Sequence, residues 1–268
     1  MSTGSFTAAS RHLIPYNLAA MIVKNDTELQ GLRAIGKICS ATLQTMLAAA
    51  QPGMTTLELD EIGRAYLEAQ GAQSAPQAMY QFPGATCISV SPVIAHGIPG
   101  AHVLALGDLV HVDVSAEKGG FYADTGASMA IGKPSPEVKA LLEATQTTLK
   151  KTLNAARAGK LISDLGRTME SEAAQRGYNT VVELASHGIG RKLHEYPSDV
   201  VNVHNPRDQR RLDDGLVLAL EPFLTPGNGR IAEERDGWSL RTRDRAIAAQ
   251  FEHTIVVTKG KPIILTQA

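Results

Sequence analysis

Four acidic residues stand in or beside apolar segments that are typical of β-strands. Asp113 and Asp124 lie in two neighbouring segments of this kind. Glu221 ends the apolar run Leu216–Leu220, and Glu252 stands near the start of another apolar segment. A carboxylate in or at the end of a buried strand costs free energy unless a partner compensates its charge. Each acid alone is typical of a charge at the rim of a sheet, but the four together indicate a shared site.

The turn Lys118–Gly119 predicts that the segments carrying the two aspartates form a β-hairpin. A turn centred between those residues places Asp113 directly opposite Asp124, with side-chain roots about 5 Å apart. Two opposed carboxylates repel each other, and a cation between them would remove that repulsion. The alternative interpretation is a pair of solvated aspartates near a turn.

His187 offers a candidate fifth ligand. It belongs to the segment Ser186–Glu195, whose glycines allow tight bending around a ligand and whose spacing matches no phosphate-binding loop. The four carboxylates carry four negative charges, which two divalent cations would balance, and a neutral imidazole adds a ligand without adding charge. Oxygen-rich ligation with one imidazole suits Mn(II), Fe(II), Co(II) or Zn(II) better than copper. The residues therefore predict a dinuclear metal site.

Other residues near these segments have simpler interpretations. His96 lies on a second tight turn, where a surface residue is the usual outcome. His111 shares a strand face with Asp113, although a half-buried packing histidine is the stronger interpretation. Glu233–Glu234 is predicted to be a solvated turn. Trp238, the only tryptophan, is predicted to pack in the core, with the wall of a pocket as the alternative.

The elements that position these residues follow a repeated order. A helix capped by Asp26 or Thr27 ends at Gln51–Gly53, and a second helix spans 56–70. Short β segments fill 86–128. Two more helices follow, one opened by Ser135 and Pro136 and one over 163–176, and the chain from Thr180 onward is again mostly β. Helix, helix, β thus occurs twice, which predicts an α+β fold of two related halves.

Composition excludes several classes of protein. The chain has 268 residues with a formal net charge of −1, so it lacks the basic surface of a bulk nucleic-acid binder. No apolar run reaches the length of a membrane span, and residues 1–20 have no secretory signal. We expect those twenty residues to form a loosely ordered extension and 21–268 to form a single catalytic domain. Two cysteines cannot build a disulfide scaffold, which fits a cytoplasmic location.

The chain resembles the type I methionine aminopeptidases, members of the pita-bread metallopeptidase family, from about Met21 to Thr266. The resemblance rests on short motifs in a fixed order: Cys87–Ser89, His96–Pro99, Asp113–Val114, Asp124–Thr125, His187–Gly190, Glu221–Pro222, Asp236–Trp238 and Gln250–Thr254. It implies a pita-bread fold, in which two pseudo-symmetric halves place a central curved antiparallel sheet under covering helices.

The resemblance also implies roles for single residues. The metal ligands would be Asp113, Asp124, His187, Glu221 and Glu252, holding two divalent ions, Co, Mn, Fe or Zn, that activate a water for attack on the first peptide bond. Glu221 would accept the proton of that water. His194 would stabilise the oxyanion, and His96 would bind the substrate nitrogen. Asp113 and the second metal would meet the free amine of the substrate.

A methionine pocket is part of the same resemblance. Its wall would be formed by Tyr80, Phe82, Cys87, Leu193 and Trp238. Leu193 stands where the family commonly has Phe, which changes the shape of that wall. Ala95 and Ser186 replace a common Cys and a common Gly beside the candidate site histidines.

The implied substrate is the free N-terminal Met of newly made proteins, removed preferentially when the second residue is small. Ribosome association, a monomeric state and no partner among membranes or specific nucleic acids are further expectations. Two alternatives remain open. One is a proline-related aminopeptidase of the same fold, which usually carries a large extra N-terminal domain. The other is a non-catalytic pita-bread module that binds RNA or protein.

Overall fold

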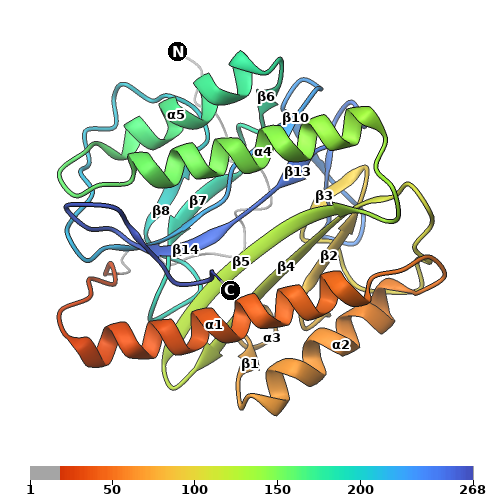
Figure 1. The fold of residues 1–268 in the computed structure, drawn as a ribbon, viewed down its shortest axis with the longest axis horizontal. Helices are drawn as coiled ribbons and strands as arrows, with labels where there is room; N and C mark the ends of the chain where they lie inside the picture. Colours follow the sequence, from red (N-terminus) through yellow and green to blue (C-terminus); the bar gives the residue numbers. More distant parts are fainter. Residues whose placement is uncertain (1–18, 268) are drawn as a thin grey trace.

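The computed structural model describes residues 19–267, and Figure 1 shows them as two pairs of long helices packed against antiparallel strands. Residues 1–18, most of the predicted N-terminal extension, lie outside the described residues. The helices are α1 (Asp26–Ala49), α2 (Thr56–Ala69), α3 (Ala75–Tyr80), α4 (Pro136–Ala155) and α5 (Ile162–Gln175). The strands are β1 (Gln73–Ser74), β2 (Cys87–Val90), β3 (Val93–Ala95), β4 (Leu109–Lys118), β5 (Phe121–Ala130), β6 (Asn179–Thr180), β7 (Ala185–Gly188), β8 (Glu195–Val201), β9 (Val217–Leu220), β10 (Phe223–Thr225), β11 (Ile231–Glu233), β12 (Leu240–Thr242), β13 (Ala249–Gln250), β14 (His253–Val256) and β15 (Ile263–Ile264).

Side-chain caps fix where three of the four long helices begin, α1, α2 and α4. The side chain of Asn25 accepts a hydrogen bond from the backbone N–H of Glu28 and caps α1, so the predicted caps Asp26 and Thr27 were wrong by one or two positions. Thr55 caps α2 in a reciprocal capping box with Glu58. Ser135 caps α4 with proline in the first turn, as predicted.

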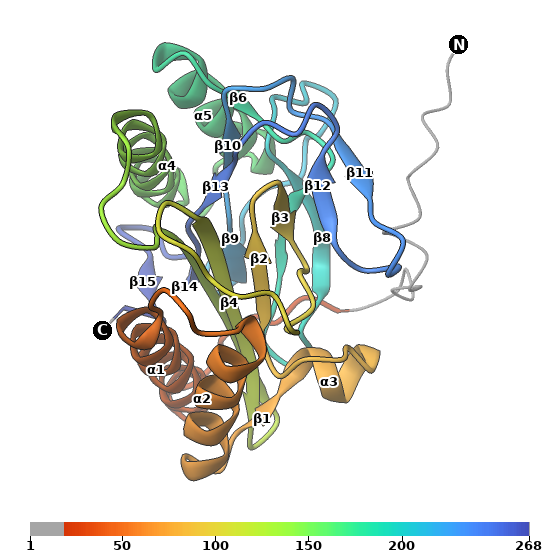
Figure 2. The same ribbon diagram turned by 90° about the vertical axis from the view of Figure 1, so that its right-hand side faces the viewer.

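The repeated order of elements is confirmed. α1 and α2 precede the sheet that contains β4 and β5, and α4 and α5 precede the sheet that contains β9 and β14. Figure 2 shows α1, α2, α4 and α5 on one side of the strands, with α3, β11 and β12 on the other. The second helices of the two halves, α2 and α5, are both 14 residues long.

Each helix pair buries an apolar face against its own strands. Leu43 of α1 and Leu59 of α2 pack with Val112 of β4 in one core cluster. In the second half, Leu153 of α4 and Leu165 of α5 pack with strand residues of β9 and β14 in another. Burial of such side chains contributes about 1.5–3 kcal/mol each. The helices therefore hold one face of the strands rigidly and leave the opposite face for other groups.

The strands form antiparallel sheets. β4 lies between β2 and β5, with β1 also paired to it, and the other large sheet has the order β15-β14-β9-β7-β8. The two halves meet where β5 approaches β14. Thr254 Oγ1 accepts from the Asp124 N–H (2.9 Å) and donates to the Asp124 carbonyl oxygen (2.7 Å). A bridge between Ala127 and Phe251 lies beside it. This junction brings the strand that carries Asp124 next to the segment that carries Glu252.

The predicted hairpin forms, but its register differs from the prediction. Gly119 and Gly120, with φ of +61° and +78°, occupy the two turn positions, and Lys118 pairs with Phe121. Ser115 therefore faces Asp124, and Asp113 faces Gly126. Asp113 and Asp124 are diagonal neighbours on one face of the sheet, so the prediction of direct opposition was wrong. Two consecutive positive φ angles favour the Gly–Gly pair over Lys118–Gly119 as the turn.

α3 was not predicted. Ser74 caps it and a proline occupies its first turn, so the start signal was present, but six residues are too few to show a helical period. Within the described part of the chain, no helix is long and apolar enough to cross a membrane.

Candidate metal centre and substrate cavity

Separate strands and the segments next to them bring the five predicted metal ligands to one place. Asp113 lies in β4 and Asp124 in β5, and His187 lies in β7. Glu221 directly follows β9, and Glu252 stands between β13 and β14. All five line a cavity of about 180 Å³. None of the residues lining it comes from α1, α2, α4 or α5, so the cavity opens on the sheet face away from those helices.

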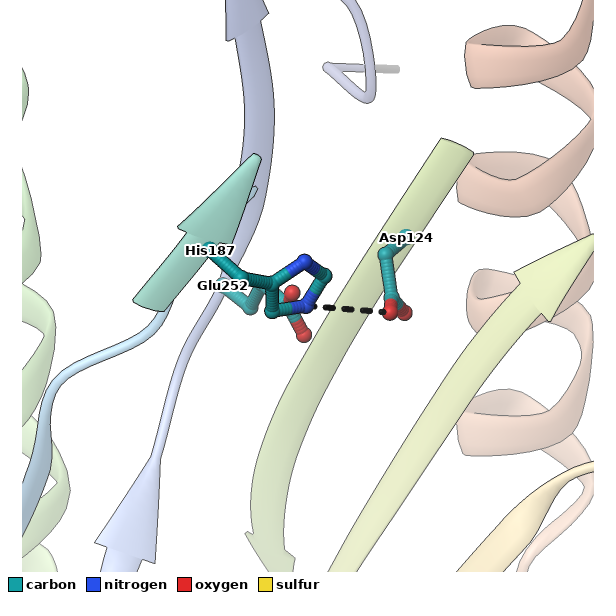
Figure 3. A group of neighbouring side chains, drawn as sticks. All are labelled: Asp124, His187 and Glu252. Carbon is teal, nitrogen blue, oxygen red and sulfur yellow. Dashed lines mark ion pairs between the residues drawn. The ribbon is translucent and has the colours of Figure 1, made fainter. Parts of the chain in front are cut away.

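Three of these side chains form the tightest group. The ligating atoms of Asp124, His187 and Glu252 all lie within 4.8 Å of one another, and each side chain is buried. Figure 3 shows the three side chains pointing toward a common space from different segments of the chain. His187 Nε2 is 3.9 Å from Asp124 Oδ2 and 3.6 Å from Glu221 Oε1. These separations leave space for a cation between the groups.

The tautomer of His187 suits a metal ligand. Its Nδ1 is 2.9 Å from the carbonyl oxygen of Gly188, and a carbonyl can only accept, so Nδ1 carries the proton. Nε2 of the neutral ring then presents its lone pair to Asp124 and Glu221. Burial lowers the pKa of His187 to about 4, which keeps the ring neutral at pH 7. A neutral imidazole held through its other nitrogen is the usual arrangement of a metal-bound histidine.

The carboxylates fit a cation because the protein alone does not satisfy them. Asp113 Oδ1, Asp124 Oδ1 and Glu252 Oε1 are buried without a hydrogen-bond partner among the described residues. Burial raises the pKa of Asp113 to about 6. Burial, followed by the charges of neighbouring acids, raises the pKa of Asp124 and Glu252 well above the usual range, and Glu221 behaves likewise. Divalent ions would neutralise these acids and bond to the unpartnered oxygens, so the residues present fit a metal centre.

A second pair of groups borders the centre. The ring of His194 lies 4.2 Å from that of His187, centroid to centroid. Its Nδ1 is 2.7 Å from the hydroxyl of Tyr80, whose pKa burial raises to about 12. Burial and the neighbouring imidazoles lower the pKa of His194 well below its usual value. His96 also lines the cavity, and its backbone has a φ of +53°, in the left-handed region.

The predicted pocket residues line the same cavity. Phe82 and Leu193 are each 3% exposed, and Phe82 meets the ring of Trp238 edge-on at 5.2 Å. Cys87 is buried beside the acids, and burial raises the pKa of its thiol well above the ordinary value. Tyr80 completes the set. Trp238 is half-buried on the cavity wall, which matches the alternative given for it above rather than simple core packing.

Sequence reasoning missed part of the cavity wall. The additional lining residues are Pro76, Ser115, Glu233, Gly237 and Leu240. Glu233 is exposed, as predicted for a solvated turn, but it ends β11 and borders the cavity, which was not predicted. Pro76 was missed together with α3. Ser115 could have been found, because it lies two residues after Asp113 and so shares its face of the strand.

His111 does not line the cavity. It is 4% exposed, and its Nε2 lies 2.8 Å from Gln250 Oε1. Packing was the stronger interpretation for this residue, and the structure adds a hydrogen bond that the sequence did not predict. Gln250 is 1% exposed and in turn donates to Glu252. Its position in a motif beside Glu252 was the available signal.

Comparison with known proteins agrees with this architecture. Residues 30–259 match the model of metallopeptidase family M24, and the chain therefore belongs to metallopeptidase family M24. Methionine aminopeptidases of several bacteria match it over nearly their whole length. Methionine aminopeptidase 2 of Bacillus subtilis (strain 168) is 46% identical over 248 residues, which cover 92% of this chain and 100% of the relative.

Solved structures support the same placement. The crystal structure of methionine aminopeptidase from Rickettsia prowazekii matches with a TM-score of 0.88 and 31% identity, covering 94% of this chain and 100% of that one. The prolidase from Pyrococcus furiosus matches with a TM-score of 0.75 at 18% identity, covering 92% of this chain and 66% of that one. This second likeness shows the fold alone. The pita-bread fold predicted above is thus confirmed.

Proposed function

We propose that this chain is a metal-dependent methionine aminopeptidase that removes a free N-terminal Met, preferentially when the second residue is small. One observation carries the proposal: four carboxylates and one neutral imidazole converge on the floor of a cavity whose wall is apolar and aromatic. The methionine aminopeptidases that match 92% of the chain support the activity. The preference for a small second residue rests on the family resemblance.

Two divalent ions are part of the proposal, held by Asp113, Asp124, His187, Glu221 and Glu252. Four carboxylates balance two such ions in charge, and Co, Mn, Fe and Zn all suit this ligand set. Bound ions would act as Lewis acids and lower the pKa of water toward neutrality.

The chain's own residues divide the proton transfers. Glu221 is half-buried at the edge of the cluster, and we assign it as the group that accepts the proton of the attacking water. A carboxylate whose pKa is raised by burial is a stronger base than a solvated one. The water oxygen bonds to the carbonyl carbon as its proton passes to Glu221, and the peptide C–N bond then breaks as Glu221 returns that proton to the leaving nitrogen.

His194 is suited to stabilise the oxygen of the carbonyl under attack. If the Tyr80 hydroxyl donates to Nδ1, the neutral ring carries its proton on Nε2, and Nε2–H can donate to the developing oxyanion. His187 has the opposite tautomer, with its proton on Nδ1. The two neighbouring imidazoles thereby take different roles, one as ligand and one as donor. His96 binds the substrate nitrogen at the scissile bond.

The substrate binds at both ends of its first residue. The free amine meets Asp113 and the acid cluster. The Met side chain fills the pocket whose wall is formed by Tyr80, Phe82, Cys87, Leu193 and Trp238. We further propose that the enzyme acts as a monomer on newly made chains in the cytoplasm, in association with the ribosome.

Metal removal tests this function. We expect chelator-treated protein to lose hydrolysis of Met-Ala-Ser, and addition of Co(II) or Mn(II) to restore it up to two ions per chain. Metal content measured on the same samples gives the stoichiometry. Full activity of a metal-free sample would contradict the proposal.

A further inference from the structure

The Gln250 side chain lies behind the metal centre and has no part in the function proposed above. It is 1% exposed, and its Nε2 donates to Glu252 Oε2 at 3.1 Å. Its Oε1 lies 2.8 Å from His111 Nε2. One amide thus connects a candidate metal ligand to a buried histidine.

The donors in this chain of hydrogen bonds are fixed by chemistry. An amide oxygen can only accept, so His111 must carry its proton on Nε2. Nδ1 of the neutral ring is then a bare acceptor, and it is buried without a hydrogen-bond partner among the described residues. With its oxygen held by His111, the Gln250 amide must turn its NH₂ group toward the acids.

Neighbouring residues hold the Gln250 backbone and pack against the His111 ring. Ser128 Oγ accepts from the Gln250 backbone N–H (2.9 Å) and donates to the Gln250 carbonyl oxygen (3.1 Å). Phe223 meets the His111 ring edge-on at 5.9 Å. Gly126 gives the necessary space, because a Cβ there would lie 2.7 Å from Gln250 Oε1 and 2.8 Å from His111 Nε2.

The Gln250 amide orients the carboxylate of Glu252. Its Oε2 is occupied by the Gln250 amide, whereas its Oε1 is buried without a partner among the described residues and stays available to a cation. A reversed amide would instead place its oxygen against a carboxylate and repel it.

We propose that Gln250 is a positioning residue for the metal centre, and that His111 locks its amide with the NH₂ group facing the glutamates. This inference rests on the proposed function only for the existence of the metal centre. Outer-shell partners of metal ligands typically change metal affinity by about 10–100-fold.

Metal binding by the full-length chain tests this role. Metal-stripped wild type, His111→Met, Gln250→Met and His111→Gln are titrated with Co(II), recording calorimetric affinity and the visible absorption spectrum of the bound ion. Both Met variants should bind Co(II) at least about tenfold more weakly, with an altered spectrum. His111→Gln keeps a side-chain N–H donor and should bind closer to wild type.

Gln73→Met is the matched control. Gln73 also donates to a glutamate, Glu117, but on the exposed surface, and its replacement should leave Co(II) binding unchanged. Should a Met variant fail to fold, Gly126→Ala serves in its place, since the added methyl group forces the amide and imidazole apart.

Wild-type affinity and spectrum in the folded variants, with only a lower melting temperature, would reduce Gln250 and His111 to packing residues and overturn the inference. Failure of the function is distinguishable. If the wild type binds Co(II) but cleaves no Met peptide, the proposed aminopeptidase activity is contradicted. The ratio of variant to wild-type affinity for Co(II) would still decide the role of Gln250.

Discussion

The metal centre and the wall of the cavity are built from different kinds of structure. Asp113 stands in a strand paired on both sides, and Asp124 is tied across the junction by Thr254. Most of the wall comes from less regular structure: Tyr80 ends the short helix α3, Trp238 lies in the turn between β11 and β12, and Phe82 and Leu193 lie outside helices and strands, so that only Cys87 stands in a paired strand. In that turn, the Trp238 N–H donates to Asp236 Oδ1 only two residues away.

The two kinds of structure suit two different functions, catalysis at the metal centre and recognition of the substrate side chain at the wall. Groups on paired strands keep fixed separations, as a cation site requires. Turns and short helices tolerate changes of shape, so the same centre can serve walls of different form. We therefore expect changes at the strand residues to abolish turnover, and changes at the wall to alter which side chain is accepted.

The largest effect should follow loss of a central ligand. Asp124→Asn removes one charge and one ligating oxygen from the tightest group, so it should lower metal content and kcat together, by more than the 10–100-fold typical of an outer-shell partner. Metal analysis and Met-Ala-Ser hydrolysis measure both quantities. Asp214→Asn, an exposed acid, is the control. Full metal content with normal turnover in Asp124→Asn would remove it from the ligand set.

His194→Ala should separate catalysis from metal binding. Loss of one oxyanion donor costs about 10²–10³ in kcat, whereas metal content should stay at the wild-type value. His102→Ala, an exposed histidine on another loop, should leave both unchanged. A fall in metal content in His194→Ala would instead make His194 a ligand.

Metal affinity should depend on pH in a defined direction. Burial raises the pKa of Asp113 to about 6 and raises the pKa of Asp124 and Glu252 well above the usual range, so in the metal-free protein these acids take up protons at higher pH than solvated carboxylates do. Cations must displace those protons, so affinity should rise with pH and weaken below about 6, by about tenfold per pH unit for each proton displaced. Calorimetry at several pH values measures how metal affinity changes with pH, and this change should be smaller in Asp113→Asn than in the wild type. Affinity independent of pH would contradict it.

The smallest effect is expected at the wall. Trp238→Ala removes the edge-on partner of Phe82 and should raise KM for Met peptides by about tenfold with little change in kcat. Phe82→Ala and the double variant complete the comparison, and the double variant should cost less than the two single changes added together. An unchanged preference for Met over Leu would place Trp238 outside the substrate wall.

The sequence predicted the strand residues of the site better than its wall. Acids inside apolar strands are visible because burial makes them costly, and the five candidate ligands do meet. The register of the hairpin that carries the two aspartates was harder to predict. A shift of the turn by one residue places Asp113 opposite Gly126 and not opposite Asp124. The four long helices carry a clear period, and three of them, α1, α2 and α4, have a side-chain cap, whereas α3 is too short to show a period.

Contacts between distant residues could not be predicted. The hydrogen bonds from His111 to Gln250 and from Tyr80 to His194 join positions 139 and 114 residues apart, and they arise only when the halves pack together. Glu233 illustrates the same limit, because nothing in a charged turn sequence says that a cavity lies beside it.

The central claim is that the acid cluster binds a free N-terminal amine and so makes this enzyme an aminopeptidase. One chromatogram of Met-Ala-Ser and N-formyl-Met-Ala-Ser, incubated with the same metal-loaded protein, tests it most directly. The formyl group removes the basic lone pair of the amine and adds bulk beside Asp113. Cleavage of the free peptide with the formylated one left intact is the predicted result, and equal cleavage of both would contradict the claim.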